Sequence, residues 1–352
     1  MNKLKIKAGK TNSAGSLNKK PLLSGKAQLV AAITALIIMI ILQSIVIGFN
    51  ENSFAGVCEK LLQSWLNILR NNTYTGVIAL GMCFVIISGG IDLSVGSITC
   101  AVGAALMYML DPVSGLLMKI GINGVLAYIL AVTSALVLGF VFGEINGILV
   151  SFGKIPPFIV TLGTMKIYRS VTQQLTKSFN PEIPSGFKQI ASFKLGNQVI
   201  LPILYWIAMV IVMHILYRKT SFGRQVVAVG SNERAAKYSG INVNTVKRRV
   251  YAISGLMCGI ASVIYIARIG SMDFANAGNG YEMESIAAVV VGGTVMSGGK
   301  GSLAGAFIGM MIIGVMNNIL NMLGVPTFLC DAFRGAIIIF AVLVQRRENK
   351  DN

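Results

Sequence analysis

The sequence predicts an all-α membrane protein, a polytopic bundle of about ten transmembrane helices, some of them interrupted. Of its 352 residues, 54% are hydrophobic and only 12% are charged, and its mean hydropathy is +0.72. Its apolar runs repeatedly reach the ~20 residues that a helix needs to cross a bilayer. The basic residues, in addition, gather in three blocks between groups of apolar runs. These observations predict both the fold class and the sides on which the loops lie.

The membrane domain is expected to cover residues 27–345. Residues 1–26, rich in Lys, Asn, Ser and Gly, predict a flexible basic tail, and residues 346–352 a second, short tail. In residues 50–71 apolar residues recur at helical spacing with charges between them, which is typical of a helix lying at the outer interface. Residues 178–198 contain two prolines and predict the largest external loop. The spans are expected at about 28–49, 73–90, 94–110, 123–150, 156–177, 199–217, 250–269, 283–298, 302–324 and 326–344.

The basic blocks predict the orientation of these spans. Seven lysines and no acidic residue lie in residues 1–26, eight basic residues against one Glu lie in residues 218–249, and three more follow the last apolar run. Cytoplasmic loops carry an excess of Lys and Arg, so we expect both termini and the 218–249 loop in the cytoplasm. Ten crossings, with six before the 218–249 loop and four after it, place both termini and this loop on the same side of the membrane. The net charge of +17 then reflects solvated inner loops rather than nucleic-acid binding.

An interruption follows the second expected span, in the stretch GGIDLSVG at residues 89–96. Gly89 and Gly90 can end a helix, because glycine adopts the left-handed conformation that closes the last turn. Asp92 is placed to cap the next helix by accepting from the N–H groups of its first turn. The alternatives for Asp92 are a polar contact with substrate or a partner helix, and proton or ion coupling. Lipid cannot satisfy the polar backbone of such a break, so we expect it against protein or a water-filled cavity.

A similar interruption recurs in the second half of the chain, as GGTVMSGG at residues 292–299. In this copy Val295 stands where the first has Asp92. Paired interruptions in two halves are a sequence indication of a transport path. The two copies share a glycine pair, a serine and a further glycine at equal spacing: Gly89, Gly90, Ser94 and Gly96 in the first, and Gly292, Gly293, Ser297 and Gly299 in the second.

Three asparagines, Asn146, Asn317 and Asn318, lie on apolar spans beside small residues. Hydrogen bonding between helices is their ordinary role, and contact with substrate is the alternative. The five cysteines are scattered and show neither disulfide nor metal spacing. The stretch GGKGS at residues 298–302 lacks the Ser or Thr that a phosphate-binding loop needs after its Lys. We therefore expect no catalytic residues, no metal site and no cofactor in this chain.

The second basic block carries a more specific pattern. Ser231 and Asn232 predict a helix start, with acidic Glu233 in the first turn. A short helix between two spans, with small side chains on it, suits docking into a cleft of another protein, and an ordinary ordered loop is the alternative. Gly240 would end this helix. Its small residues are Ala235 and Ala236.

From about residue 67 to the C-terminus, the sequence resembles the permease subunits of bacterial ABC importers for ribose and related simple sugars. That family also includes permeases for xylose, galactose, autoinducer-2 and nucleosides. The resemblance is carried by LGMCFVIISGGIDLSVGS, GEINGILVSFGKIPPFIVTLGTM, FGRQVVAVGSNERAAKYSGI and GYEMESIAAVVVGGTVMSGGKGSLAG, which occur in the family's order.

The resemblance implies a multi-pass protein of the bacterial plasma membrane in which two permease chains, here a homodimer, form a shared path. It also implies a cytoplasmic ATPase with two fused nucleotide-binding halves and an extracytoplasmic sugar-binding protein. The broken-helix motif maps onto residues 89–96. Coupling to the ATPase maps onto Gly230, Asn232, Glu233, Ala235, Ala236 and Gly240.

The sequence departs from the family pattern at several positions, and these bear on which sugar is carried. Ser231, Ser170, Val295, Met296 and Asn318 each replace the family's usual residue. The expected function is import of a monosaccharide, ribose or a related simple sugar, with ATP hydrolysed on a separate subunit. Permeases for autoinducer-2 or nucleosides are alternatives within the family. An ion-coupled secondary transporter is the alternative from another class, and it would need no docking site for an ATPase.

Overall fold

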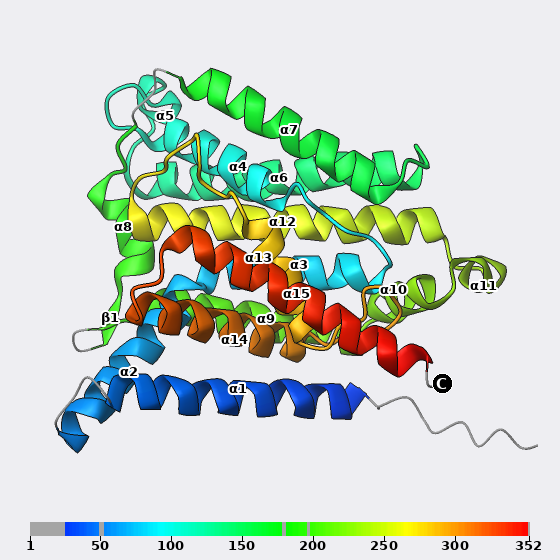
Figure 1. The fold of residues 1–352 in the computed structure, drawn as a ribbon. Coiled ribbons are helices and arrows are strands. Elements are labelled where there is room, and N and C mark those ends of the chain that lie inside the picture. Colours follow the sequence, from blue (N-terminus) through cyan, green and yellow to red (C-terminus); the bar gives the residue numbers. More distant parts are fainter. Residues whose placement is uncertain (1–24, 49–52, 178–180, 196–197, 351–352) are drawn as a thin grey trace, which may run out of the picture.

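The computed structural model describes residues 25–48, 53–177, 181–195 and 198–350, and it is α-helical apart from one small hairpin (Figure 1). Most of the predicted N-terminal tail therefore lies outside the described residues. The elements are α1 (Gly25–Gly48), α2 (Phe54–Asn71), α3 (Thr73–Ile87), α4 (Val95–Leu110), α5 (Leu116–Lys119), α6 (Gly124–Ser151), α7 (Pro157–Thr176), α8 (Ser185–Ser192), β1 (Lys194–Leu195), β2 (Gln198–Val199), α9 (Leu201–Lys219), α10 (Ser221–Ser231), α11 (Glu233–Tyr238), α12 (Val243–Ile269), α13 (Tyr281–Val291), α14 (Leu303–Met322) and α15 (Thr327–Lys350).

The long helices run along one common direction, so the molecule has two ends (Figure 1). The start of α1, the α10–α11 segment and the end of α15 lie at one end, and α2, α5, α8 and the hairpin lie at the other. The 218–249 block lies at the first of these ends, and so do the described residues next to the other two blocks, the start of α1 and the end of α15. The assignment of that end to the cytoplasm remains a prediction from the distribution of charge.

Several helices are long and apolar enough to cross a membrane, which confirms the all-α, multi-pass fold class. Among the described residues, five qualify by length and hydropathy, namely α1, α6, α9, α12 and α14, and the apolar helices α3 and α4 are shorter. The predicted positions of the remaining spans are occupied by α7, α13 and α15. The count of ten crossings stays a prediction.

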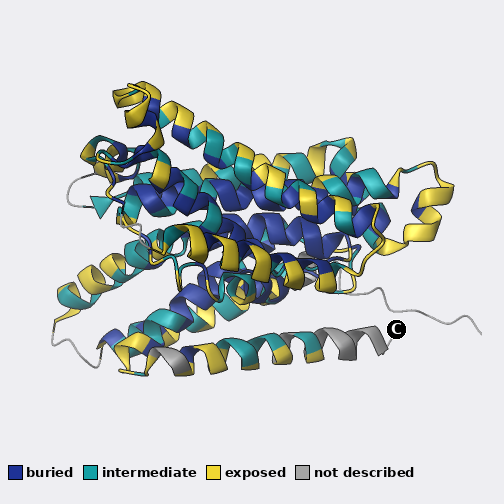
Figure 2. Ribbon diagram, turned by 90° about the horizontal axis from the view of Figure 1, so that it is seen from above, coloured by how far each residue is buried: buried dark blue, intermediate teal, exposed yellow. Residues whose placement is uncertain are grey.

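The core forms around α12, whose most extensive contacts are with α6 and α3. Buried residues are concentrated in the central helices, whereas the outer helices expose much of their surface (Figure 2). A Cβ added at Gly143 of α6 would lie 2.3 Å from Tyr251 O, and one at Gly255 of α12 would lie 2.2 Å from Gly139 O. Only glycine allows two helix backbones to approach this closely. The glycines therefore hold α6 and α12 in direct backbone contact.

Three predicted boundaries differ from the structure, and a predicted loop contains a helix. The prediction that a span covers 283–298 is wrong at its end, because α13 stops at Val291 where the glycine pair begins. Helix α12 starts at Val243, before the predicted residue 250, because Asn242 caps it by accepting the Thr245 N–H. Helix α15 continues to Lys350, past the predicted 344. The predicted external loop contains α8, whose amphipathic sequence buries Phe187.

Candidate functional site: two helix breaks, a docking segment and a polar cavity

The first break is closed at its helix end by backbone hydrogen bonds. Gly89 has φ +82°, and its N–H donates to Ile86 O at 2.9 Å, while the Gly90 N–H donates to Val85 O at 2.9 Å. This is the pattern that ends a helix at a left-handed glycine. The chain then crosses to α4, for which Ser94 is the N-cap residue. The predicted role of the glycine pair matches this geometry.

Asp92 is fully buried at the centre of a polar network that joins three helices. Its Oδ1 accepts from Ser94 N at 3.0 Å and from Ser94 Oγ at 2.6 Å, and its Oδ2 accepts from Ser254 Oγ at 3.0 Å. Asn146 Nδ2 donates to Ser94 Oγ at 2.7 Å, which brings in α6. The carboxylate thus bonds the N–H of the N-cap residue rather than one of the first turn, which differs from the cap that was predicted. Its second role is a contact with α12 through Ser254.

Gly96 allows the loop between α12 and α13 to approach the start of α4. A Cβ at this position would lie 2.0 Å from Gly278 O, in the loop between α12 and α13. Arg169 on α7 holds the same loop by donating to Ala277 O. Gly96 therefore serves backbone packing.

The second break ends its helix in the same way but restarts later. Gly293 has φ +88°, and the Thr294 N–H donates to Val289 O at 3.1 Å. Helix α14 begins only after Ser302, whose Oγ accepts the Gly305 N–H at 3.1 Å. The structural counterpart of Ser94 is therefore Ser302 and not Ser297. Ser297 lies inside a link that is longer than that of the first break.

The two breaks meet each other and the end of α10. The Gly299 N–H donates to Ile87 O at 2.8 Å. A Cβ added at Gly230 would lie 1.8 Å from Ile87 O and 2.7 Å from Gly299 N. We call this contact of residues 87–90, 298–301 and 230–231 the break junction. Because three backbones touch there, a displacement of one segment displaces the others.

The segment after the break junction forms the short helix that was predicted. Asn232 Oδ1 accepts the Ala235 N–H at 3.0 Å and so caps α11, and Gly240 closes it with φ +81°. Glu233 pairs with Lys247 of α12 at 2.6 Å. One detail of the prediction is wrong: Ala236 is buried against its own chain, 4% exposed, so it offers no docking surface. The side chain that projects from this end is Tyr238, 91% exposed.

A polar cavity of about 240 Å³ lies among α2, α3, α13, α14 and α15. Glu284 and Arg334 form an ion pair across it at 2.9 Å. Both residues stand in expected spans, and charges at such positions could have indicated the site from the sequence. Its lining includes Asn71, Asn72, Tyr74, Thr75, Glu284, Asn317, Asn318, Asn321 and Arg334.

The structure separates the roles of the two adjacent asparagines on α14. Asn318 Oδ1 accepts from Gln43 Nε2 at 2.9 Å and from Ser64 Oγ at 3.0 Å, so it links α14 to α1 and α2. This is the interhelical role. Asn317 Oδ1 is buried and has no hydrogen-bond partner in the described part of the chain. Asn317 is therefore the one whose acceptor remains available in the polar cavity.

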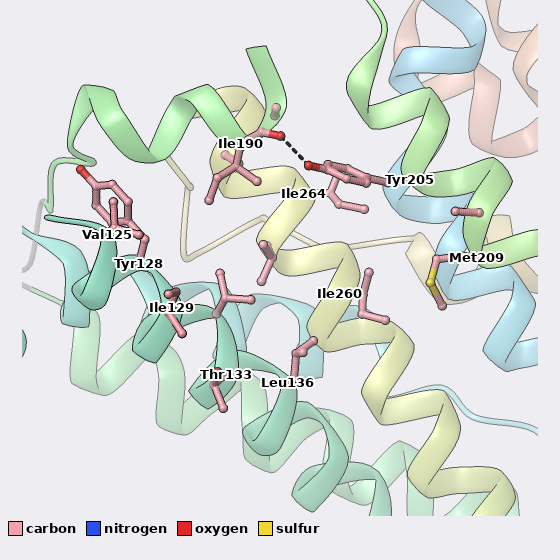
Figure 3. Close-up of a pocket in the computed structure, with 15 residues that line it drawn as sticks. Val125, Tyr128, Ile129, Thr133, Leu136, Ile190, Tyr205, Met209, Ile260 and Ile264 are labelled. Atoms are coloured by element: carbon pink, nitrogen blue, oxygen red, sulfur yellow. Dashed lines mark hydrogen bonds between the residues drawn. The ribbon is translucent and has the colours of Figure 1, made fainter. Parts of the chain in front are cut away.

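A cavity larger than the polar one has the wrong chemistry for a polar solute. It has a volume of about 560 Å³ and is lined by apolar side chains of α6, α8, α9 and α12 (Figure 3). The hydroxyl of Tyr205 at its edge is already donated to Ile190 O at 2.9 Å. Two of the helices that form it, α6 and α9, have less than a third of their residues buried inside the bundle. Size alone would select this cavity, but its lining favours contact with hydrocarbon.

Comparison with known proteins places the chain in a permease family. Residues 64–342 match the family described as branched-chain amino acid transport system / permease component. The chain belongs to this permease family. The permease is 36% identical to the ribose import permease of Escherichia coli K12 over 89% of this chain and 93% of that protein. It is 40% identical to the ribose import permease of Bacillus subtilis, over 81% and 85% respectively.

The similarity extends to a permease named for another sugar. The permease is 34% identical to the fructose import permease of Bifidobacterium longum, over 96% of this chain and 92% of that protein. No solved structure matches. Family membership and the apolar helices together make this chain a multi-pass membrane transport component. In its described residues no group of three or more His, Cys, Asp or Glu could hold a metal ion.

Proposed function

We propose that this permease forms the membrane path of an ATP-driven importer for a monosaccharide, ribose or a closely related simple sugar. A second copy of the chain completes the path, an extracytoplasmic binding protein delivers the sugar, and a separate cytoplasmic ATPase drives transport. The names of its relatives support the sugar class. The contact of Gly230 with the two helix breaks supports transport driven by an ATPase.

The observation that carries the proposal is the backbone contact of Gly230 with both breaks. The exposed helix α11 follows Gly230 by only a few residues, and it projects from the end of the molecule where the basic blocks lie (Figure 1). An ATPase that binds α11 and changes conformation would displace Gly230. Because Ile87 O and Gly299 N lie against it, both interrupted helices would shift with it. Coupling is then a direct mechanical contact, with no intermediate side-chain relay.

The ion-coupled alternative lacks a comparable observation. A coupling carboxylate has to exchange a proton or an ion during transport. The Asp92 carboxylate instead accepts three hydrogen bonds from Ser94 and Ser254 and is fully buried. None of the four cavities described in the bundle includes it in its lining. These contacts favour a structural role for Asp92.

The test is reconstitution of the permease with its own ATPase and binding protein in liposomes. Ribose entry should require ATP and the binding protein. Tyr238→Ala should leave membrane insertion unchanged, because the side chain is 91% exposed, but should weaken binding of the ATPase by about tenfold or more, as loss of an aromatic anchor does. Tyr108→Ala, a half-exposed tyrosine on α4, is the matched control.

Two results would count against the proposal. Ribose entry driven by an ion gradient without the ATPase would replace it by secondary transport. Normal ATPase binding by Tyr238→Ala would remove α11 from the docking site. Xylose, fructose, adenosine and autoinducer-2 tested in place of ribose would then show which substrate of the family is carried.

A further inference from the structure

We propose that the polar cavity among α2, α3, α13, α14 and α15 binds the sugar during its passage, with Asn317 and Arg334 as the residues that hold its hydroxyl groups. This inference rests on the proposed function, because it names where in the path a neutral polyhydroxyl substrate is held. Nothing in the sequence motifs of the two breaks points to this place.

The cavity has the right polarity for a sugar. Five asparagines face it, and each amide offers both donors and an acceptor. Sugar hydroxyls also donate and accept, so an amide lining can replace the water that a sugar loses. Tyr74 adds an aromatic ring to the wall. An apolar solute would leave these amides without partners, at a cost in free energy.

The charges of the cavity are compensated, which argues against an ion as the ligand. Glu284 lies 2.9 Å from Arg334 Nη2, and Arg334 Nη1 donates to Asp331 at 2.7 Å. A charged solute would have to compete with these contacts. A neutral ligand leaves them intact and can use the hydrogen-bonding groups that remain.

Two such groups remain, and they are complementary to a hydroxyl. Asn317 Oδ1, an acceptor, and Arg334 Nε, a donor, are both buried, and neither has a hydrogen-bond partner among the residues described. Buried polar groups are normally paired. A hydroxyl group can donate to the first and accept from the second. Both residues line the same cavity, so a sugar held there lies beside both of them.

The position of the cavity, at the helix ends opposite the break junction, also fits a site that holds the sugar soon after the binding protein delivers it. It lies near Thr75 at the start of α3, Glu284 at the start of α13 and Asn317 towards the end of α14. The break junction lies at the opposite ends of the same three helices. Movement at the junction therefore acts on the helices that enclose the cavity. By the predicted orientation the cavity opens towards the side from which the binding protein delivers the sugar.

The experiment measures ribose delivered per ATP hydrolysed in the reconstituted complex. Asn317→Leu removes the amide at similar size, and Arg334→Lys keeps the charge beside Glu284 but removes the Nε donor. Each variant should deliver about tenfold less ribose per ATP, equivalent to about 1.4 kcal/mol, while hydrolysis stimulated by the loaded binding protein continues. Asn317→Gln, which keeps the amide, should recover most of the delivery.

Asn318→Leu should lower the amount of folded protein, because Gln43 and Ser64 lose their acceptor. Asn123→Leu, which replaces an exposed amide outside this cavity, is the matched control and should leave ribose per ATP unchanged. Wild-type delivery ratios in both Asn317→Leu and Arg334→Lys would overturn the cavity assignment while wild-type import still supports the proposed function. If the Asn317→Leu variant fails to insert into the membrane, the ribose delivery of Arg334→Lys alone tests the cavity assignment. No ATP-dependent ribose entry by the unmodified complex would overturn the proposed function itself.

Discussion

The two helix breaks end alike but are held differently. At the first, the buried Asp92 carboxylate accepts hydrogen bonds that tie the link to α4 and α12. At the second, the longer link is held by backbone contacts and by Thr294, whose Oγ1 accepts the Ser302 N–H at 3.4 Å and lies 3.7 Å from Cys83 Sγ. Hydrogen bonds to a charged group are the stronger kind. The difference teaches that a buried carboxylate ties the first break to neighbouring helices, whereas the second break is held mainly by backbone contacts and a neutral hydroxyl.

The largest expected effect comes from separating the breaks at their common contact. Gly230→Ala would place a Cβ 1.8 Å from Ile87 O, so the backbone must shift. Uptake and sugar-stimulated ATP hydrolysis should fall by about a hundredfold, because overpacking of this size costs about 1–3 kcal/mol. Gly163→Ala on α7, where a Cβ meets nothing within 4 Å, is the control. Equal activity of the two variants would show that the junction transmits nothing.

Removing the anchor of the first break should have the next largest effect. Asp92→Leu leaves Ser94 and Ser254 without their acceptor, and each hydrogen bond to a charged group contributes about 1.5–3 kcal/mol. The unfolding temperature in detergent should drop, and uptake by the protein that remains folded should fall by less than in Gly230→Ala. Asp92→Asn keeps an acceptor oxygen and should retain most uptake. Loss of uptake in an Asn variant of normal thermal stability would instead assign the charge a role in transport.

The smallest effect is expected at the second break. Thr294→Val keeps the shape but removes the hydroxyl and its contacts with Ser302 and Cys83, at a cost of about 1 kcal/mol for each neutral hydrogen bond. Thermal stability should fall slightly, and transport should change less than in Asp92→Leu. A loss of stability as large as that of Asp92→Leu would show that both breaks are anchored equally, which would contradict the comparison.

The sequence was sufficient for the features that are local in the chain. Hydropathy predicted the helices, the first glycine pair predicted where α3 ends, and Asn232 with Gly240 predicted the bounds of α11. The second glycine pair marked an interruption, but the span predicted over 283–298 ran past the end of α13 at Val291. The sequence failed on the restart of α14, because a glycine pair marks a helix end but not the length of the link that follows. It also failed on Ala236, since six residues are too few to show which face of a helix is buried.

The polar cavity could be predicted only in part, because the charges of Glu284 and Arg334 in expected spans mark these residues but not their pairing. Its ion pair joins Glu284 to a residue 50 positions later, on another helix, and neither residue has a periodic pattern that points to the other. The separation of Asn317 from Asn318 depends on Gln43 and Ser64, which lie more than 250 positions away. Such partners are set by how the helices pack, which hydropathy and local motifs do not determine.

The glycine contact between α6 and α12 also sets the order in which the protein can mature in the membrane. About 100 residues separate Gly139 from the start of α12, so at about 5–20 residues per second the ribosome needs roughly 5–20 s to supply the partner helix. During that interval Asp92 has Ser94, itself bonded to Asn146 of α6, but not Ser254. The early pairing of α4 with α6 thus shelters a charged group within the nascent protein until synthesis delivers the helix that completes its surroundings.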